Sequence, residues 1–121
     1  MIRGAAPQLR TTDLAASIRF YTEVLGLELA FEFGGFYAGL RAGGTMLHLK
    51  HADAPDPSIP YVAEGGHLHL WLEAEDEDAV AACIAAQGVA LLAPPHDTPW
   101  GTRECVLRDD QGHTLHIGRV T

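Results

Sequence analysis

Histidine is the residue type in this sequence that could do chemistry at a defined place. Three of the seven histidines lie in stretches with strand-like alternation, namely His48, His67 and His116, and His69 follows two residues after His67. Three neutral imidazoles and a water would complete a tetrahedral zinc site with one open position. The interpretation that we favour is a set of hydrogen-bonded cavity histidines, because metal ligation needs a convergent geometry that spacing cannot establish.

The alternation of side chains predicts that these histidines share one face of a sheet. In one stretch His67, His69 and Trp71 alternate with leucines, and successive residues of a strand point to opposite faces. The leucines are expected to pack under helices, while the histidines and the tryptophan line a cavity. The same parity sets His48 and His116 opposite their apolar neighbours, so three strands bring histidines to that cavity.

Aromatic residues form a second group with a candidate role. A proline-rich stretch carries Trp100 at its tip, and a bulky aromatic in a stiff loop beside a sheet suits the wall of a ligand site. Covering an edge of the core is an alternative that the sequence leaves open for both tryptophans. The candidate ligand-binding residues are Trp100, Trp71, Phe36 and Tyr37 as stacking walls, with His69, Arg103 and His48 as polar groups.

Two copies of one order of elements would position these residues. The first copy is predicted as a strand at 6–12, a helix from Asp13 to Gly26, and strands at 27–33, 36–41 and 45–50. The second copy is predicted as a strand at 66–73, a helix from Glu75 to Gly88, and strands at 89–93, 102–107 and 114–117. Each helix is expected to begin at an acidic residue and to end at a glycine.

This pattern predicts an α+β fold of two βαβββ modules, with the helices packed outside curved mixed sheets. We expect one domain over residues 1–121, with module one at about 5–50, a linker or ordered loop at about 51–65 and module two at about 66–119. A tight turn at 109–112 joins the last two strands, because its aspartates can bond their own backbone and its glycine permits a positive φ.

Composition limits the classes of function. The chain of 121 residues has a formal net charge of −8, which argues against nucleic acid as a partner. It contains no apolar run of about 20 residues, and its first residues lack the apolar centre of a signal peptide. We therefore expect a cytoplasmic protein that is not a membrane protein. Cys83 and Cys105 are expected to be reduced core thiols, and the acidic run 75–78 is expected to be a solvated helix start.

Two motifs resemble the vicinal oxygen chelate superfamily, which groups glyoxalase I, extradiol dioxygenases and bleomycin-resistance proteins. Its first-module signature is similar to residues 13–26, with Asp13-Leu14, Ile18-Arg19-Phe20-Tyr21 and Leu25-Gly26. The second-module ending of the bleomycin-resistance branch is similar to Pro99-Trp100-Gly101-Thr102-Arg103-Glu104 followed by Arg108-Asp109-Asp110-Gln111-Gly112. The resemblance covers essentially the whole chain, agrees with the predicted repeat and is not specific for one activity.

The resemblance implies a homodimer of paired modules and, in metal-dependent members, an ion held by four sheet positions. Those positions fall here on Ala6, His48, His67 and His116. Ala6 carries no ligand atom, although Gln8 lies in the same predicted strand, and the family's enzymes generally have glutamate where this chain has His48 and His116. Neither the carboxylate base of a glyoxalase nor the two-histidine, one-carboxylate set of an extradiol dioxygenase is complete.

Three functions remain open, and whether the protein is an enzyme is among the open points. The first is a small-molecule-binding protein that sequesters a drug-like, aromatic or cationic ligand in a dimer-associated groove, as bleomycin-resistance proteins do. The second is a metal-dependent lyase, isomerase or dioxygenase that uses a divalent Zn, Ni, Fe or Mn ion, with Glu32, Glu64, Glu73 and Glu104 as candidate bases. The third is a structural or regulatory module whose cavity is incidental.

Overall fold

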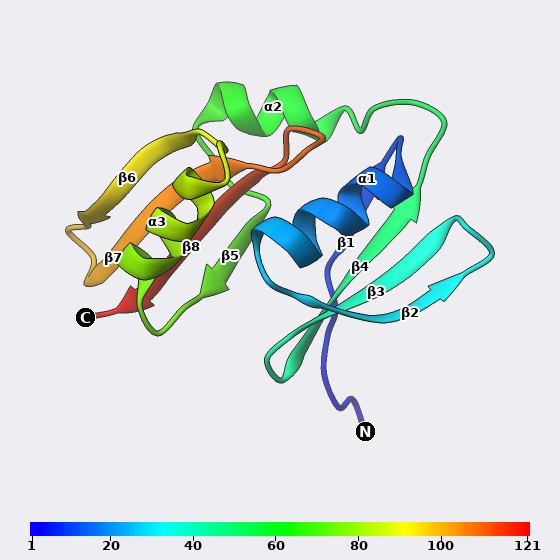
Figure 1. Cartoon of the computed structure of the whole chain (residues 1–121), viewed down its shortest axis with the longest axis horizontal. Coiled ribbons are helices and arrows are strands. Elements are labelled where there is room, and N and C mark those ends of the chain that lie inside the picture. Colours follow the sequence, from blue (N-terminus) through cyan, green and yellow to red (C-terminus); the bar gives the residue numbers. More distant parts are fainter. The chain divides into compact units, whose positions relative to one another are not determined.

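The computed structural model describes residues 1–121 and divides into two compact units, Met1–Asp56 and Pro57–Thr121 (Figure 1). Each unit contains a four-stranded mixed sheet and a βαβββ order of elements, so the predicted α+β fold is confirmed. None of the helices combines the length and the apolar character that a membrane-spanning helix requires. That the two units act as one domain stays a prediction.

The first unit is a sheet with the strand order β1-β4-β3-β2, in which only β1 and β4 run parallel. Its elements are β1 (Gln8–Thr11), α1 (Leu14–Arg19), the π-helix η1 (Phe20–Val24), β2 (Glu28–Phe33), β3 (Tyr37–Ala42) and β4 (Thr45–His51). α1 packs on β3 and β4, where Leu40, Leu47 and Leu49 are buried. The alternate residues form the opposite face, which we call the first polar face: Gln8, Arg10, Tyr37, Gly39, Met46, His48 and Lys50.

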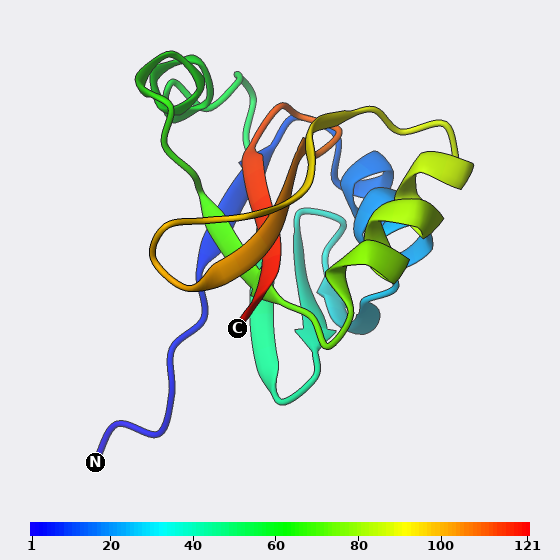
Figure 2. The same ribbon diagram turned by 90° about the vertical axis from the view of Figure 1, so that its left-hand side faces the viewer.

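The second unit repeats this arrangement as β5-β8-β7-β6, with β5 parallel to β8. Its elements are α2 (Ser58–Gly65), β5 (Leu70–Glu73), α3 (Glu77–Ala86), β6 (Leu91–Asp97), β7 (Thr102–Arg108) and β8 (Thr114–Val120). α3 packs on β6, β7 and β8 (Figure 2), where Cys105, Leu107, Leu115 and Ile117 are buried. The opposite face, which we call the second polar face, carries Trp71, Thr102, Glu104 and His116.

The two main helices begin in the same way and differ by one residue in length. Asp13 and Asp76 cap them by accepting the N–H of Ala16 and of Ala79, so the second helix begins after Asp76, one residue beyond its predicted start at Glu75. The helix after Asp13 does not stay α-helical, since η1 is a π-helix in which the Leu25 N–H donates to the Phe20 carbonyl. A π-turn takes up an extra residue within a helix, which accounts for the longer first helix.

The predicted linker contains a helix that the prolines concealed. Pro57 occupies the N-cap of α2 and Pro60 lies in its first turn, where backbone N–H groups have no intrahelical partner and proline is tolerated. Gly66 closes the helix with a φ of 68°, as a left-handed C-terminal glycine does. The segment predicted as a linker or an ordered loop is therefore helical over Ser58–Gly65, and its role as a linker stays a prediction.

Two strand boundaries also differ from the prediction. β5 begins at Leu70 rather than at Gly66, so His67 and His69 precede the strand. β6 extends through Pro94 and Pro95 to Asp97, a stretch that was predicted as a loop. β6 is an edge strand with register shifts before His96, and an edge or a bulge is where a sheet tolerates proline.

The acidic run at the start of α3 is exposed as predicted at Glu75, Asp76 and Asp78, but the prediction was wrong for Glu77. Glu77 is completely buried, and its carboxylate lies 3.2 Å from Arg103 Nε and 2.8 Å from Arg119 Nε. These contacts are ion pairs rather than well-aligned hydrogen bonds. The two arginines are register partners on β7 and β8, so one carboxylate joins the helix to two strands. Cys83, predicted in the core, is exposed on α3, whereas Cys105 is buried as expected.

We expect Glu77→Gln to lower the free energy of unfolding by about 2 kcal/mol, because removing one partner of a buried ion pair leaves charge uncompensated. The loss is smaller than for a fully enclosed pair, since both arginine side chains reach solvent. Urea denaturation measures it. Asp97→Asn is the control: its carboxylate is exposed and lies 3.4 Å from Arg103, and it should change stability by less than about 0.5 kcal/mol. Equal effects of the two substitutions would contradict this account of α3.

Candidate functional site

A buried carboxylate organises the second polar face. Glu104 on β7 is only 4% exposed and accepts hydrogen bonds from three side chains. Trp71 Nε1 donates at 2.8 Å, the Thr102 hydroxyl at 2.9 Å and His116 Nδ1 at 3.0 Å. The ladder explains this convergence, because Trp71 and His116 are register partners and β7 lies on the other side of β8. Glu104 thereby fixes a tryptophan and a histidine that the sequence predicted as site residues.

The hydrogen bonds keep Glu104 ionised. Burial alone would raise the pKa of its carboxyl group, but donation from Trp71, His116 and Thr102 outweighs burial and lowers that pKa. An ionised acceptor holds the proton of His116 on Nδ1, which leaves the Nε2 lone pair of a neutral imidazole for another partner. A histidine oriented by a carboxylate can accept a proton or act as a metal ligand.

The equivalent histidine of the first unit has a different partner. Gln8 Nε2 donates to the Tyr37 hydroxyl at 3.1 Å, and that hydroxyl lies 2.9 Å from His48 Nδ1. A hydroxyl can donate to the imidazole nitrogen or accept a second hydrogen bond from it, so this contact is compatible with either tautomer of His48. His116 is thus held in one tautomer by a carboxylate, whereas His48 is not, although both occupy the middle of the last strand of their unit.

Aromatic rings surround His48. The rings of Phe31 and Tyr37 are nearly parallel, at 5° with centroids 6.4 Å apart, and both meet the imidazole edge-on. Gly39 makes this cluster possible, because a Cβ at that position would overlap the ring of Phe31. Phe31 remains 43% exposed and Phe33, which pairs with Tyr37 in register, is 68% exposed. The first polar face thus presents flat apolar surface beside polar groups.

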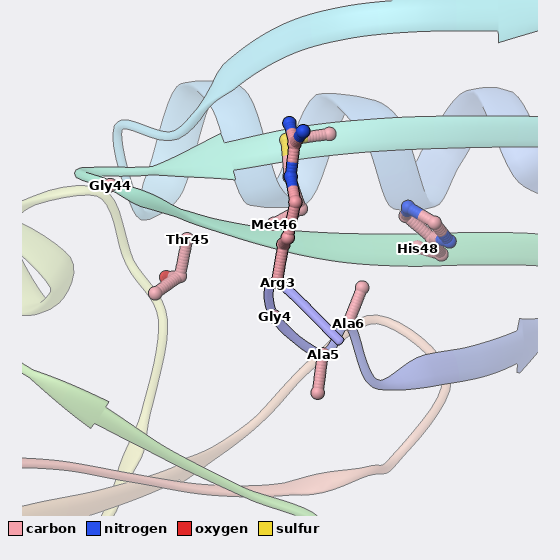
Figure 3. Close-up of a pocket in the computed structure, with 8 residues that line it drawn as sticks. All are labelled: Arg3, Gly4, Ala5, Ala6, Gly44, Thr45, Met46 and His48. Atoms are coloured by element: carbon pink, nitrogen blue, oxygen red, sulfur yellow. The ribbon is translucent and has the colours of Figure 1, made fainter. Parts of the chain in front are cut away.

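A cavity of about 550 Å³ opens beside this cluster (Figure 3). The segment that precedes β1 forms one wall, and the β3–β4 turn with the start of β4 forms another. The lining residues are Arg3, Gly4, Ala5, Ala6, Gly44, Thr45, Met46 and His48. Its size suits a small organic molecule, and His48 belongs both to this cavity and to the aromatic cluster.

The predicted metal set is not assembled within either unit. His67 lies before β5 and is exposed, and His69 has both ring nitrogens engaged, since Nε2 contacts the Ser58 hydroxyl and Nδ1 accepts the Thr114 N–H. In neither unit do three or more histidine, cysteine, aspartate or glutamate side chains form a group that could hold a metal ion. His48 in one unit and His116 in the other each use Nδ1 in a side-chain hydrogen bond and form none through Nε2.

The register of the two sheets also reassigns one position. Gln8 pairs with His48 in the first sheet, and Trp71 pairs with His116 in the second. Gln8 and Trp71 are therefore equivalent positions. The residue two places before Gln8 is Ala6 and the residue two places before Trp71 is His69, so His69, not His67, is the counterpart of Ala6. Because His69 Nδ1 is an acceptor, its proton is on Nε2 and is donated to Ser58, so His69 is not set to activate that hydroxyl as a nucleophile.

The other predicted ligand residues have different surroundings. Arg103 faces α3 rather than the second polar face; it donates two hydrogen bonds of 2.9 Å to Asp78, and these bonds lower the pKa of that carboxyl group. Trp100 lies at the tip of the β6–β7 connection and is 72% exposed. Phe36, at the β2–β3 turn, packs edge-to-face on Phe33. Their ligand roles stay predictions.

Sequence reasoning missed part of both polar faces. Phe31 and Phe33 were not chosen, although their alternation in a strand places them on the face of Tyr37. Glu104 was named as one of four candidate bases, with no signal that it is buried under Trp71 and His116. That signal exists only in the pairing of three strands, which a single sequence does not specify.

The chain is similar to known proteins over nearly its whole length. The family model described as Glyoxalase/Bleomycin resistance protein/Dioxygenase superfamily matches residues 5–117. An uncharacterized protein of Mycolicibacterium smegmatis is 36% identical over 107 residues, which cover 88% of this chain and 84% of that protein.

"Putative glyoxylase CFP32" of Mycobacterium tuberculosis is 32% identical over 113 residues, and the match covers 91% of this chain. The chain spans only 41% of the length of that relative. The crystal structure of the bleomycin-binding protein from bleomycin-producing Streptomyces verticillus, complexed with copper(II)-bleomycin, superposes with a TM-score of 0.73 at 25% identity. That superposition covers 100% of this chain and 98% of the other.

We expect the stabilising effect of Glu104 to depend on pH. The folded protein lowers the pKa of this carboxyl group below its ordinary value of 4.5, so its contribution is present above that value and is lost as the pH falls below it. Glu104→Gln should lower the free energy of unfolding by about 2 kcal/mol at pH 7, and the difference from the wild type should shrink below pH 4.5. Urea titrations at several pH values measure this difference.

Thr102→Val is the matched control, because it removes one donor and leaves the carboxylate. It should cost about 1 kcal/mol and keep the pH dependence of the wild type. A Glu104→Gln difference that is as large at pH 3.5 as at pH 7 would show that the carboxyl group is not held ionised.

Proposed function

The chain belongs to the glyoxalase/bleomycin resistance protein/dioxygenase superfamily, and we propose that it binds a small aromatic molecule without converting it. The observation that carries this proposal is the aromatic cluster of the first unit, in which Phe31, Tyr37 and His48 lie together beside the cavity. In this proposal the protein sequesters a drug-like ligand.

The cluster has the features of a site for a planar ligand. Exposed aromatic rings bury a large apolar area when a flat molecule stacks on them, and Phe31 and Phe33 keep much of their surface free. The chain Gln8–Tyr37–His48 holds one imidazole in a fixed orientation beside the rings. Apolar walls with a few fixed polar groups are typical of small-molecule sites.

A known relative supports binding. The protein from Streptomyces verticillus, of the same fold, was crystallised with copper(II)-bleomycin. For this chain we propose binding of the same general kind in a homodimer within the cytoplasm, with Trp100, Trp71 and Phe36 as further stacking surfaces. A role in antibiotic resistance would follow if the ligand is a drug.

A second candidate function rests on the Glu104–His116 pair. A histidine whose Nδ1 proton is held by a buried carboxylate is suited to accept a proton at Nε2, or to bind a divalent Zn, Ni, Fe or Mn ion with Glu104 as the orienting partner. The relative named as a glyoxylase is consistent with an enzyme. We rank this candidate second, because in neither unit do three or more potential ligand side chains form a group that could hold a metal ion.

Binding of the neutral probe 2-naphthylmethanol tests the first candidate. Tyr37→Ala and Phe31→Ala should each weaken binding by about 1 kcal/mol, or roughly fivefold, through lost stacking. Gly39→Ala should also weaken it, because it keeps every ring but displaces that of Phe31. Isothermal titration calorimetry measures the affinity.

Tyr61→Ala is the matched control for these variants, since Tyr61 is an exposed tyrosine of α2 in the second unit. It should leave the affinity unchanged. If the Tyr61 variant loses as much affinity as the Tyr37 variant, or if the probe does not bind at all, the first polar face is not the ligand site.

Metal content decides between the two candidates. The protein purified without a His tag, and then incubated in turn with Zn, Ni, Fe and Mn salts, should hold far less than one ion per chain by elemental mass spectrometry. One ion per chain that disappears in His116→Ala and stays in His96→Ala, a change at a histidine bonded only to the Pro94 carbonyl, would instead favour the metal-dependent enzyme.

A further inference from the structure

We propose that the ligand of the first polar face is an aromatic acid, whose carboxylate is bound by Arg10 and Lys50 while its ring lies on the aromatic cluster. This inference rests on the proposed function and adds the charge of the ligand. The sequence allowed an aromatic or a cationic ligand, and the inference keeps the aromatic class and replaces the cationic one.

The acidity of the protein is not shared equally by its two units. The first unit contains six acidic and five basic residues, whereas the second contains ten acidic and three basic ones. Net charge therefore describes the second unit and says little about the first. The field at a binding surface depends on the charges nearest to it, which for the first polar face are basic.

Strand register places these basic groups in a row. Arg10, Lys50, Tyr37 and Phe33 are successive register partners across the four strands. Register partners point to the same face, and neighbouring strands lie about 4.8 Å apart. The row therefore begins with two cations, Arg10 and Lys50, and continues with the two aromatic rings. An aromatic ring with an attached carboxylate is long enough to contact both halves of the row.

The basic groups are available to a ligand. Arg10 and Lys50 are both exposed, and no carboxylate of the unit forms an ion pair with either of them. Glu28 and Arg41 extend this face through the register of Arg41 with Met46, and Glu28, its one acidic residue, lies 3.3 Å from Arg41 and is neutralised by it. Two adjacent unpaired cations favour an anion between them, because the anion removes their mutual repulsion.

The neighbouring row adds a histidine beside these cations. Gln8, His48 and Gly39 are register partners one step along the sheet. Arg3 lines the cavity together with His48. The face combines guanidinium and ammonium donors with aromatic surface, and an arginine can bind a carboxylate through two parallel hydrogen bonds.

Three probes with one ring system test the charge. These are 2-naphthoate, 2-naphthylmethanol and 2-naphthylmethylammonium, titrated into the full chain by calorimetry at low and at high salt. We expect naphthoate to bind about tenfold more tightly than the ammonium probe at low salt, and the preference should decrease as salt screens the charges.

Charge variants locate the effect. Arg10→Gln and Lys50→Gln should each weaken naphthoate binding several-fold and leave the affinity for naphthylmethanol unchanged. Arg19→Gln is the matched control, since Arg19 is an exposed basic residue of α1 in the same unit, and α1 packs on the other face of the sheet. It should change naphthoate affinity by less than about twofold.

The outcomes separate this inference from the proposed function. Equal affinity for all three probes, or tighter binding of the ammonium probe, would overturn the anionic ligand and keep the aromatic site. Naphthoate binding that Arg10→Gln and Lys50→Gln leave intact would overturn the assignment of the carboxylate position. If none of the probes binds, both the inference and the proposed function fail.

Discussion

The two-residue period of the strands is the constraint on which the rest of this structure depends. In each sheet one set of alternate residues is buried against a helix, as for Leu47 and Leu49 against α1. The other set is then directed to the opposite face without any further requirement. Polar and aromatic residues can accumulate there because the apolar set alone stabilises the sheet. His48 and His116 occupy their positions for this reason before any function is considered.

Equivalent positions do not imply equivalent chemistry. The neighbour of His48 is the hydroxyl of Tyr37, whereas the neighbour of His116 is the carboxylate of Glu104. An ionised carboxylate can only accept, so it fixes the tautomer of His116, whereas a hydroxyl can donate or accept and leaves both tautomers open to His48. The fold supplies a repeated scaffold, and one residue on the third strand of each unit decides what the histidine can do.

The sequence predicted those properties that depend on local periodicity, and it failed where distant residues meet. The repeat, the cap at Asp13 and the turn at 109–112 follow from short patterns, and the turn is closed as expected by Asp109 Oδ1, which accepts three backbone N–H groups. The start of β5 could not be predicted from the alternation, because His67 alternates with leucines whether or not a partner strand extends to it. The burial of Glu77 was invisible because its arginines come from strands far along the chain. The formal net charge was misleading about the first polar face for a similar reason, because it is a sum over both units.

The ion-paired Glu77 has a consequence for how freely the two helices can move. Apolar packing is non-directional, so a helix held mainly by leucines can shift a little at low cost. α1 is held in this way, with one buried hydroxyl pair between Ser17 and Thr11. α3 cannot slide or rotate without separating its carboxylate from two arginines. The helices of the two units therefore differ in how easily they can shift on their sheets. The helix that shifts more easily, α1, belongs to the unit that carries the aromatic cluster and the cavity.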